Sequence, residues 1–255
     1  MLSPSDLAPV ELVNADGRAD FVFVCEHAGA AIPQRLGNLG LPAAELVRHI
    51  AFDIGAEAVA RRLSARLDAQ LLIQRYSRLV VDCNRPFSAP DCIPEVSDGT
   101  VVPANLRLSD YQRCQRYNEI HEPFHREVAN LLDRRAETGS PTVLVAVHSF
   151  TGRLRGGPIR PWQLGVLSNR DPSFAESFFA AFQRRNPTTI SARNEPYGVD
   201  DEGDYTIPVH GEARGLSHLL LEIRNDLIGN ADGQRIWSSL IVEALIEARE
   251  KESRQ

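Results

Sequence analysis

The sequence is missing the features that mark several broad classes of protein. No apolar run approaches the roughly 18 residues of a membrane-spanning helix, and no basic start leads into an apolar stretch, so we expect neither a membrane segment nor a secretion signal. The net charge is −6, and lysine and arginine form no tail or stripe, which argues against a nucleic-acid partner. We therefore predict a cytoplasmic protein that acts on a small anionic molecule. The sequence indicates no oligomeric state.

The chain also lacks the short motifs of nucleotide binding and of serine catalysis. It contains no GxxxxGK[ST] or GxGxxG segment and no GxSxG turn, so neither a phosphate-binding loop nor a serine nucleophile is predicted. The cysteines show no CxxC spacing, and in a chain without a secretion signal we expect reduced thiols. These cysteines are Cys25, Cys83, Cys92 and Cys114.

Apolar residues recur with two different periods along the chain. Apolar runs typical of strands occupy 21–27, 69–84, 141–150, 163–169, 188–196 and 216–226. Within 69–84 we predict one strand, a bend at residues 75–77 and a second extended piece. Helical spacing, over one helix or two pieces in the first case, occupies 42–67, 109–139, 171–185 and 232–252. Residues 87–108 are typical of a long irregular loop. The alternation predicts one three-layer α/β/α domain over residues 1–255, with a central mixed, mainly parallel sheet and an N-terminal extension over 1–19.

Four of the predicted strands end in titratable or hydrogen-bonding side chains. In open α/β sheets, ligands bind beyond the carboxyl ends of the strands, so four such ends together predict a common site. The residues at these ends are Glu26 and His27, then Asp82, Asn84 and Arg85, then His148 and Ser149, and finally Glu222 and Arg224.

Two of these residues, His27 and His148, are histidines at the end of an apolar strand. Neutral imidazoles joined by a carboxylate are the ligand set of a catalytic zinc ion with an open water position, whereas either histidine alone is also explained by a hydrogen bond to a backbone carbonyl. Asp53 lies among apolar neighbours in the predicted helix 42–67. Because an unpaired buried carboxylate is costly, Asp53 needs a partner, and a metal ion, a helix N-terminus or an arginine would each serve.

Two further segments have both a structural and a functional interpretation. Glu222 lies in the apolar segment LLLEIR, where burial raises the pKa of a carboxylate toward the range of a general base; a salt bridge to an arginine is the alternative. In VVDCNRP, residues 80–86, either Arg85 pairs with Asp82 and caps a turn, or Asn84 and Arg85 clamp an anionic substrate.

Six segments resemble, in order, the N-formylglutamate amidohydrolase family, from about Phe21 to Glu243. They are VCEHAGAAIP, HIAFDIGAEAVARRL, YSRLVVDCNRP, YNEIHEPFH, VAVHSF and LLLEIRNDLI. The resemblance implies a zinc-dependent amidohydrolase that cleaves N-formyl-L-glutamate to glutamate and formate, a reaction of histidine catabolism. It also implies a fold of the zinc-peptidase or phosphorylase/hydrolase type, with aspartoacylase-like deacylases as more distant relatives.

The resemblance further implies roles for individual residues. The implied metal ligands are His27, Asp53 and His148. Glu222 matches the glutamate that acts as base. The stretch DCNR matches an Asp-x-Asn-Arg segment of the aspartoacylase-like relatives, so Asn84 and Arg85 would hold the substrate carboxylate, with Asp82 orienting Arg85 from behind.

Four more residues lie in the matched segments or in the polar loop near them. Arg78, Arg224 or His210 would stabilise the oxyanion, and we assign Arg78 and His210 to catalysis. Arg224 and His125 are assigned to substrate binding.

One position departs from the family pattern. Glu26 stands where family members tend to have a proline before the first motif histidine. Glu26 would replace Asp53 as the third metal ligand, or it would hold His27 from outside the coordination sphere. The departure favours, as an alternative, a deacylase or peptidase for a different acidic N-acyl substrate. A catalytically silent relative that binds a ligand is the third hypothesis.

Overall fold

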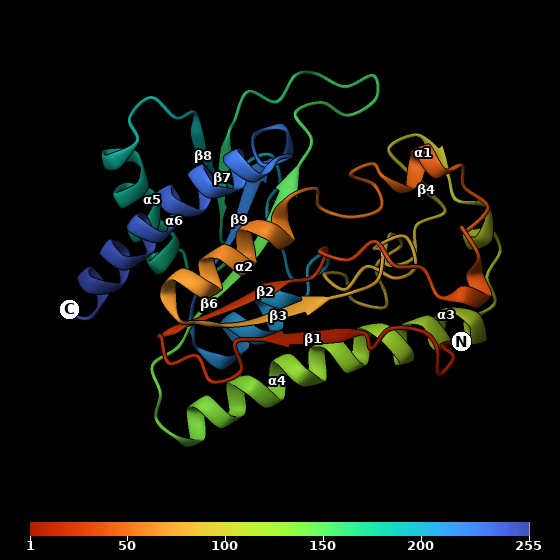
Figure 1. Cartoon of the computed structure of the whole chain (residues 1–255), viewed down its shortest axis with the longest axis horizontal. Coiled ribbons are helices and arrows are strands. Elements are labelled where there is room, and N and C mark those ends of the chain that lie inside the picture. The colour runs from red at the N-terminus through yellow and green to blue at the C-terminus, as the bar shows by residue number, and fades with distance from the viewer. Residues whose placement is uncertain (255) are drawn as a thin grey trace.

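The structure, a computed structural model that describes residues 1–254, centres on a seven-stranded sheet (Figure 1). In spatial order the strands are β1 (Val10–Val13), β3 (Gln70–Gln74), β2 (Phe21–Cys25), β6 (Val143–Phe150), β9 (Ser217–Arg224), β7 (Leu164–Leu167) and β8 (Ser191–Arg193). Strands β3, β2, β6 and β9 run parallel, β1 is antiparallel to β3, and the parallel pair β7–β8 is antiparallel to β9. The predicted mixed, mainly parallel sheet is confirmed, and β1 adds an edge strand within residues 1–19.

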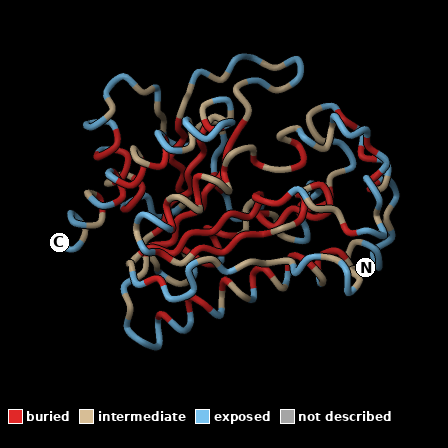
Figure 2. Tube along the Cα trace, in the orientation of Figure 1, coloured by how far each residue is buried: buried red, intermediate tan, exposed pale blue. Residues whose placement is uncertain are grey.

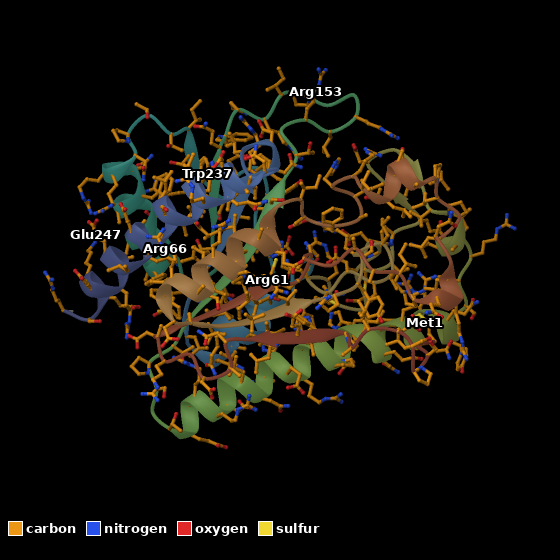
Figure 3. All side chains as sticks on the ribbon, viewed as in Figure 1. Met1, Arg61, Arg66, Arg153, Trp237 and Glu247 are labelled. Carbon is orange, nitrogen blue, oxygen red and sulfur yellow. The ribbon has the colours of Figure 1, made fainter. Side chains whose placement is uncertain are left out.

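Helices cover both faces of the sheet. The helices α2 (Ala56–Leu67), α5 (Ser173–Arg185) and α6 (Ala231–Glu252) pack on one face, and α4 (Glu122–Glu137) packs on the other. Every residue of β2 and β6 is buried (Figure 2), which explains why both strands have continuous apolar sequences. Side chains fill the layers between sheet and helices (Figure 3), where Trp237 of α6 stacks on Phe182 of α5.

The remaining elements are short. They are the helices α1 (Ala43–Leu46) and α3 (Asp110–Arg116), the 3-10 turns η1 (Gln34–Leu36), η2 (Pro103–Asn105), η5 (Glu212–Arg214) and η6 (Asn225–Leu227), and the π-helical turns η3 (Tyr117–His121) and η4 (Ile207–Gly211). A hairpin of β4 (Val96–Ser97) and β5 (Thr100–Val101) lies in the predicted loop 87–108. None of the helices in residues 1–254 is long and apolar enough to cross a membrane, and the four cysteines are free.

The predicted helix 109–139 begins as expected but continues through a widened turn. The Ser109 hydroxyl accepts a hydrogen bond from the Gln112 amide, and the Gln112 side chain accepts one from the Ser109 amide. Pro123 lies in the first turn of α4, directly after the π-helical turn η3. Because proline lacks an N–H donor, the irregular turn before it takes the place of the predicted kink or break.

Segment 42–67 forms two helical pieces, and Asp53 lies outside both of them. The first piece ends at Leu46 and the second begins at Ala56. Gly55 precedes the second piece with φ of 83°, and a Cβ atom there would lie 2.2 Å from the carbonyl oxygen of Ile228. The chain therefore turns sharply at a position that only glycine fits. The prediction of a helical Asp53 is wrong.

In segment 69–84 the first predicted strand is present as β3, but the second extended piece, which ends in VVDCNRP, is wrong because residues 80–84 form a buried turn. The Val80 amide donates to the Ser77 carbonyl, the Asp82 amide to the Cys92 carbonyl, and the Arg85 amide to the Asp82 carbonyl. Val80 and its neighbour are apolar because they belong to the core on the α4 face of the sheet. A short buried apolar run does not by itself distinguish a strand from a buried turn.

Candidate active site

Three neighbouring parallel strands bring polar residues to one edge of the sheet. Strand β6 lies between β2 and β9 and pairs with both. Glu26 and His27 directly follow β2. His148 in β6 is in register with Glu222 in β9. The carboxyl ends of these strands, where ligands bind in open α/β sheets, therefore bring the four residues together.

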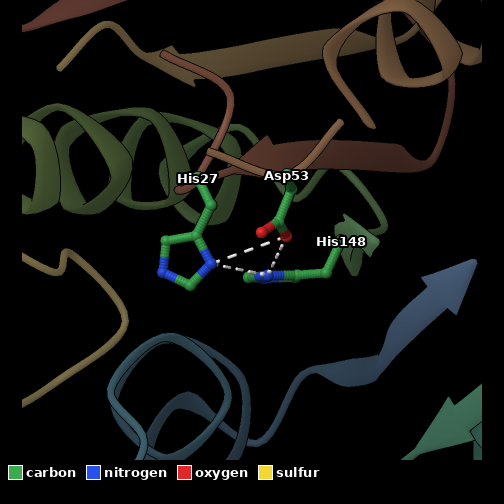
Figure 4. Close-up of side chains that lie close together, drawn as sticks. All are labelled: His27, Asp53 and His148. Carbon is green, nitrogen blue, oxygen red and sulfur yellow. Dashed lines mark hydrogen bonds and ion pairs between the residues drawn. The ribbon is translucent and has the colours of Figure 1, made fainter. Parts of the chain in front are cut away.

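Two histidines and an aspartate converge at this edge (Figure 4). His148 Nδ1 lies 3.1 Å from His27 Nδ1 and 3.1 Å from Asp53 Oδ2, and His27 Nδ1 lies 3.6 Å from Asp53 Oδ2. All three side chains are buried, and one possible ligand atom from each lies within 4.8 Å of the others. This spacing suits a single ion held by three ligands.

A carboxylate other than Asp53 lies beside the Nε2 atom of each histidine ring. His27 Nε2 lies 2.6 Å from Asp82 Oδ1, and His148 Nε2 lies 3.1 Å from Glu26 Oε2. Burial raises the pKa of Asp82, but Arg78 and His27 hold that pKa well below its ordinary value. Burial raises the pKa of Glu26 as well, and His148 lowers it to below its ordinary value. Both carboxylates are therefore ionised. Asp82 accepts a hydrogen bond from His27 Nε2, whereas Glu26 Oε2 and His148 Nε2 are close but not aligned as a hydrogen bond, so Glu26 favours a hydrogen on that Nε2 through its charge.

Hydrogens on both Nε2 atoms leave a lone pair on each Nδ1, and these lone pairs face each other and the Asp53 carboxylate. Three acceptors this close require a positive charge between them. In the protein alone a proton supplies that charge: burial lowers the pKa of His148, but Glu26 and Asp53 raise it well above its ordinary value. Imidazoles oriented by outer carboxylates, with a carboxylate beside them, also form the donor set of a divalent metal such as zinc. The residues present therefore fit such an ion.

Backbone and side-chain donors hold Asp53 in this position. Its Oδ2 accepts a hydrogen bond from the Ser149 amide at 3.0 Å, and its Oδ1 lies 3.4 Å from Arg78 Nη1. The Asp53 amide donates to the His27 carbonyl at 2.8 Å. Burial raises the pKa of Asp53, but His27 and His148 lower it to below its ordinary value. The carboxylate is thus ionised and oriented before any ligand binds.

Glu222 lines the same cavity. Its side chain is buried, and its Oε2 has no hydrogen-bond partner among residues 1–254. Burial raises the pKa of Glu222 to about 7, so the group is able to exchange a proton near neutral pH. Arg224 does not neutralise it, because its guanidinium pairs with Asp226 at 2.7 Å.

These residues line a cavity of about 350 Å³. Besides His27, Asp53, His148 and Glu222, the charged and aromatic groups of its wall are His49, Arg78, Arg85, Asp91, Phe150, Tyr197, Asp200 and Asp204. No pattern in the sequence indicated five of these residues: His49, Asp91, Tyr197, Asp200 and Asp204. All five lie outside the main strands and helices, where no periodic pattern indicates which side chains face a site.

Arg85 lines the cavity but is already paired within the chain. Its Nη1 donates to Asp204 Oδ1 at 2.9 Å and to the Gly203 carbonyl at 2.7 Å, and its Nε donates to Asp91 Oδ2 at 3.0 Å. Asn84 Nδ2 donates to the same Asp204 oxygen at 3.0 Å. The Asn84 and Arg85 donors therefore converge on one carboxylate position.

Of the three residues considered for the oxyanion, Arg78 lines the cavity, whereas Arg224 and His210 are absent from its described wall. The Nε and Nη2 atoms of Arg78 donate to Asp82 Oδ2 at 3.0 and 2.6 Å. Asp82 thus orients Arg78 and His27 rather than the Arg85 guanidinium that we expected it to orient.

His125 and His210 lie behind the turn that carries Arg85, outside the cavity wall. His125 Nε2 donates to the Cys83 carbonyl at 2.6 Å, and His125 Nδ1 lies 3.0 Å from His210 Nε2. His121 Nε2 donates to the Arg85 carbonyl at 3.0 Å. Burial lowers the pKa of His121 and of His210 to about 4, and that of His125 well below its ordinary value. The three neutral rings therefore support the backbone of this turn.

His125→Leu is expected to lower the free energy of unfolding by about 1–3 kcal/mol, because the buried Cys83 carbonyl loses its donor. His125→Gln retains an N–H group of similar reach and serves as the matched control. Urea unfolding of the two variants and the parent protein measures the difference. Equal stability of the two variants would show that the hydrogen bond to Cys83 makes no measurable contribution.

Comparison with known proteins gives a family and a fold. The sequence model of the N-formylglutamate amidohydrolase family matches residues 19–229. A gene product of Agrobacterium tumefaciens with a known crystal structure is 36% identical, and the match covers 99% of both chains with a TM-score of 0.95. An N-formylglutamate amidohydrolase from Ralstonia eutropha is 18% identical over 98% of this chain and 100% of that chain, and its TM-score of 0.67 shows a shared fold. No curated protein sequence matches the chain.

Proposed function

Because the chain belongs to the N-formylglutamate amidohydrolase family, we propose that it is a metal-dependent hydrolase that cleaves the amide bond of a small N-acyl amino acid. N-Formyl-L-glutamate, cleaved to glutamate and formate, is the substrate that we propose. The observation that carries the proposal is the convergence of His27, Asp53 and His148 beside Glu222 in the wall of one cavity.

Three ligand atoms would hold the metal: His27 Nδ1, His148 Nδ1 and Asp53 Oδ2. Two imidazoles and one carboxylate favour zinc with an open coordination position. Bound zinc lowers the pKa of a water molecule to about 7 and polarises an amide carbonyl. Asp82 and Glu26 keep the two rings in the tautomer that presents Nδ1 to the ion.

Glu222 is the proposed general base. Its carboxylate accepts a proton from the attacking water and delivers it to the nitrogen of the leaving amine. A pKa raised by burial to about 7 suits a group that must both take and release a proton near neutral pH. The Arg78 guanidinium, in the same wall, stabilises the negative charge that develops on the carbonyl oxygen.

Arg85 is the proposed partner of the substrate carboxylate. Its planar guanidinium suits a carboxylate, and Asn84 Nδ2 is aimed at the same position, as their shared contact with Asp204 Oδ1 indicates. The cavity volume of about 350 Å³ lies within the range of small-molecule sites. His125 and His210 are proposed to act through the turn that carries these two residues, without touching the substrate.

Removal of the metal is expected to abolish hydrolysis of N-formyl-L-glutamate, and one equivalent of zinc is expected to restore it. Formate release and the metal content of the purified protein are measured before chelation, after chelation and after zinc addition. Formyl, acetyl and succinyl derivatives of glutamate, aspartate and glutamine identify the preferred acyl group and side chain. Hydrolysis that survives complete metal removal would overturn the metal dependence. Failure of the zinc-loaded protein to cleave any of these compounds would overturn the proposed hydrolase activity.

A further inference from the structure

The two donors proposed for the substrate carboxylate meet a carboxylate of the chain itself. Asn84 Nδ2 and Arg85 Nη1 both donate to Asp204 Oδ1, at 3.0 and 2.9 Å. Asp204 lies between β8 and η4 and, like the other two residues, lines the cavity. A site for a carboxylate is therefore present, and a side chain of the loop before η4 occupies it.

This pairing leaves Arg85 without the donors that a second carboxylate needs for a bidentate contact. A guanidinium has five N–H groups, and a bidentate contact uses two of them on different nitrogens. Nη1 donates to Asp204 and to the Gly203 carbonyl, and Nε donates to Asp91. Nη2 alone has no partner in the described part of the chain. A bidentate ligand must therefore displace Asp91 from Nε, or displace Asp204 or the Gly203 carbonyl from Nη1.

We propose that Asp204 is an internal competitor that occupies the position of the substrate carboxylate and so sets the affinity for anionic substrates. The incoming carboxylate takes over the donors of Asn84 and Arg85, and the Asp204 side chain rotates away from them. Asp204 is the displaced group because it uses the donors of both Asn84 and Arg85, whereas Asp91 and the Gly203 carbonyl contact Arg85 alone. The inference rests on the proposed function for the identity of the substrate, but the competition applies to any small carboxylate.

The environment of Asp204 favours its release. Burial raises the pKa of Asp204, and the opposing effects of Arg85 and of the hydrogen bond from the Asp200 amide do not offset it fully, so the ionised form is less stable here than in water. The neighbouring residues Asp200, Asp201 and Glu202 are exposed. A rotation of the Asp204 side chain toward this exposed segment regains hydration, and it gives up the hydrogen bond that Oδ2 accepts from the Asp200 amide at 3.1 Å.

The test measures the binding of glutarate by calorimetry, with glutaramide as the uncharged counterpart and with equal metal content in every variant. Asp204→Asn is expected to lower the dissociation constant of glutarate by about tenfold, because a neutral amide competes less well than a carboxylate for the guanidinium. Binding of glutaramide is expected to stay unchanged. The KM for N-formyl-L-glutamate is expected to fall together with the dissociation constant of glutarate.

Asp91→Asn is the matched comparison, since it also removes a carboxylate from Arg85. The Asp91 side chain is 57% exposed, so we expect a change of less than about twofold in the dissociation constant of glutarate. Asp204→Ser repeats the measurement with a shorter side chain, and melting temperatures check that each variant is folded. An unchanged or higher dissociation constant in both Asp204 variants, or an equal gain in Asp91→Asn, would overturn the inference.

The outcome for Asp204 is separate from the outcome for the proposed function, because glutarate has no amide bond to hydrolyse. Tighter glutarate binding by Asp204→Asn in a protein without turnover would support the role of Asp204 as internal competitor and contradict the proposed hydrolase activity. Turnover of N-formyl-L-glutamate with unchanged glutarate binding in both Asp204 variants would support the proposed hydrolase activity and contradict the role of Asp204 as internal competitor.

Discussion

Glu222→Gln is expected to keep the bound metal and to lower kcat by about 10²- to 10⁴-fold, the range associated with loss of a general base. The glutamine has nearly the same size and fills the same buried position in β9, so the strand and the His148 beside it stay in place. What the variant loses is the ionisable carboxylate that accepts a proton, because an amide does not take up a proton near neutral pH. Glu222 is also outside the cluster of His27, Asp53 and His148, so metal binding does not depend on it.

Single-turnover kinetics and metal analysis on the same samples separate the chemical step from metal loss. Glu243→Gln, in an exposed position of α6 and outside the cavity wall, is the control for a change of charge without a catalytic role. If Glu222→Gln kept more than a tenth of the parent activity, Glu222 would not be the general base. Loss of the metal in this variant would instead make Glu222 a ligand.

The sheet and the residues at its carboxyl edge were predictable from local pattern and one topological rule. The apolar runs around His148 and Glu222 are continuous because β6 and β9 are buried on both faces. Parallel strands then place their carboxyl ends at the same edge. His27, two residues beyond β2, reaches the same position for the same reason.

The local conformation around Asp53 and Asp82 was not predictable in this way. Both side chains are brought to the site by buried turns whose backbone hydrogen bonds go to distant segments, such as the Asp53 amide to the His27 carbonyl and the Asp82 amide to the Cys92 carbonyl. The apolar residues in these turns have the same periodicity as residues in a helix or a strand. A pattern read within a short window therefore gave the correct burial and the wrong conformation.

The contact of Arg85 and Asn84 with Asp204 was also not predictable from the sequence. Asp204 contacts Asn84 across a sequence separation of 120 residues, and it lies in a loop with three other acidic residues at 200, 201 and 202. No feature of the sequence distinguishes the one acid that turns inward from those that remain in solvent. That choice depends on how the loop packs against the turn at 82–85, which is a property of the complete fold.

Asp53→Asn is expected to weaken metal binding more than any change in the carboxylates behind the histidines. Asparagine has the same shape and still accepts the hydrogen bond from the Ser149 amide, but it lacks the negative charge that faces His27 Nδ1 and His148 Nδ1. Replacement of a residue outside the coordination sphere typically lowers metal affinity by about 10- to 100-fold. We expect Glu26→Gln to fall within that range and Asp53→Asn to exceed it.

Glu26 was expected either to be the third ligand or to hold His27, but it lies beside His148, and Asp82 lies beside His27. This pair of variants decides whether Glu26 is a ligand or holds His148 from outside the coordination sphere. Glu26 Oε2 lies 3.1 Å from His148 Nε2, whereas Asp53 Oδ2 lies 3.1 Å from His148 Nδ1. The two carboxylates therefore sit on different sides of one imidazole ring, and a single ion on the Nδ1 side is within reach of Asp53 alone. Competition with a fluorescent zinc chelator measures both affinities. A larger loss in Glu26→Gln than in Asp53→Asn would require the ring to bind the ion through Nε2, and it would make Glu26 the third ligand.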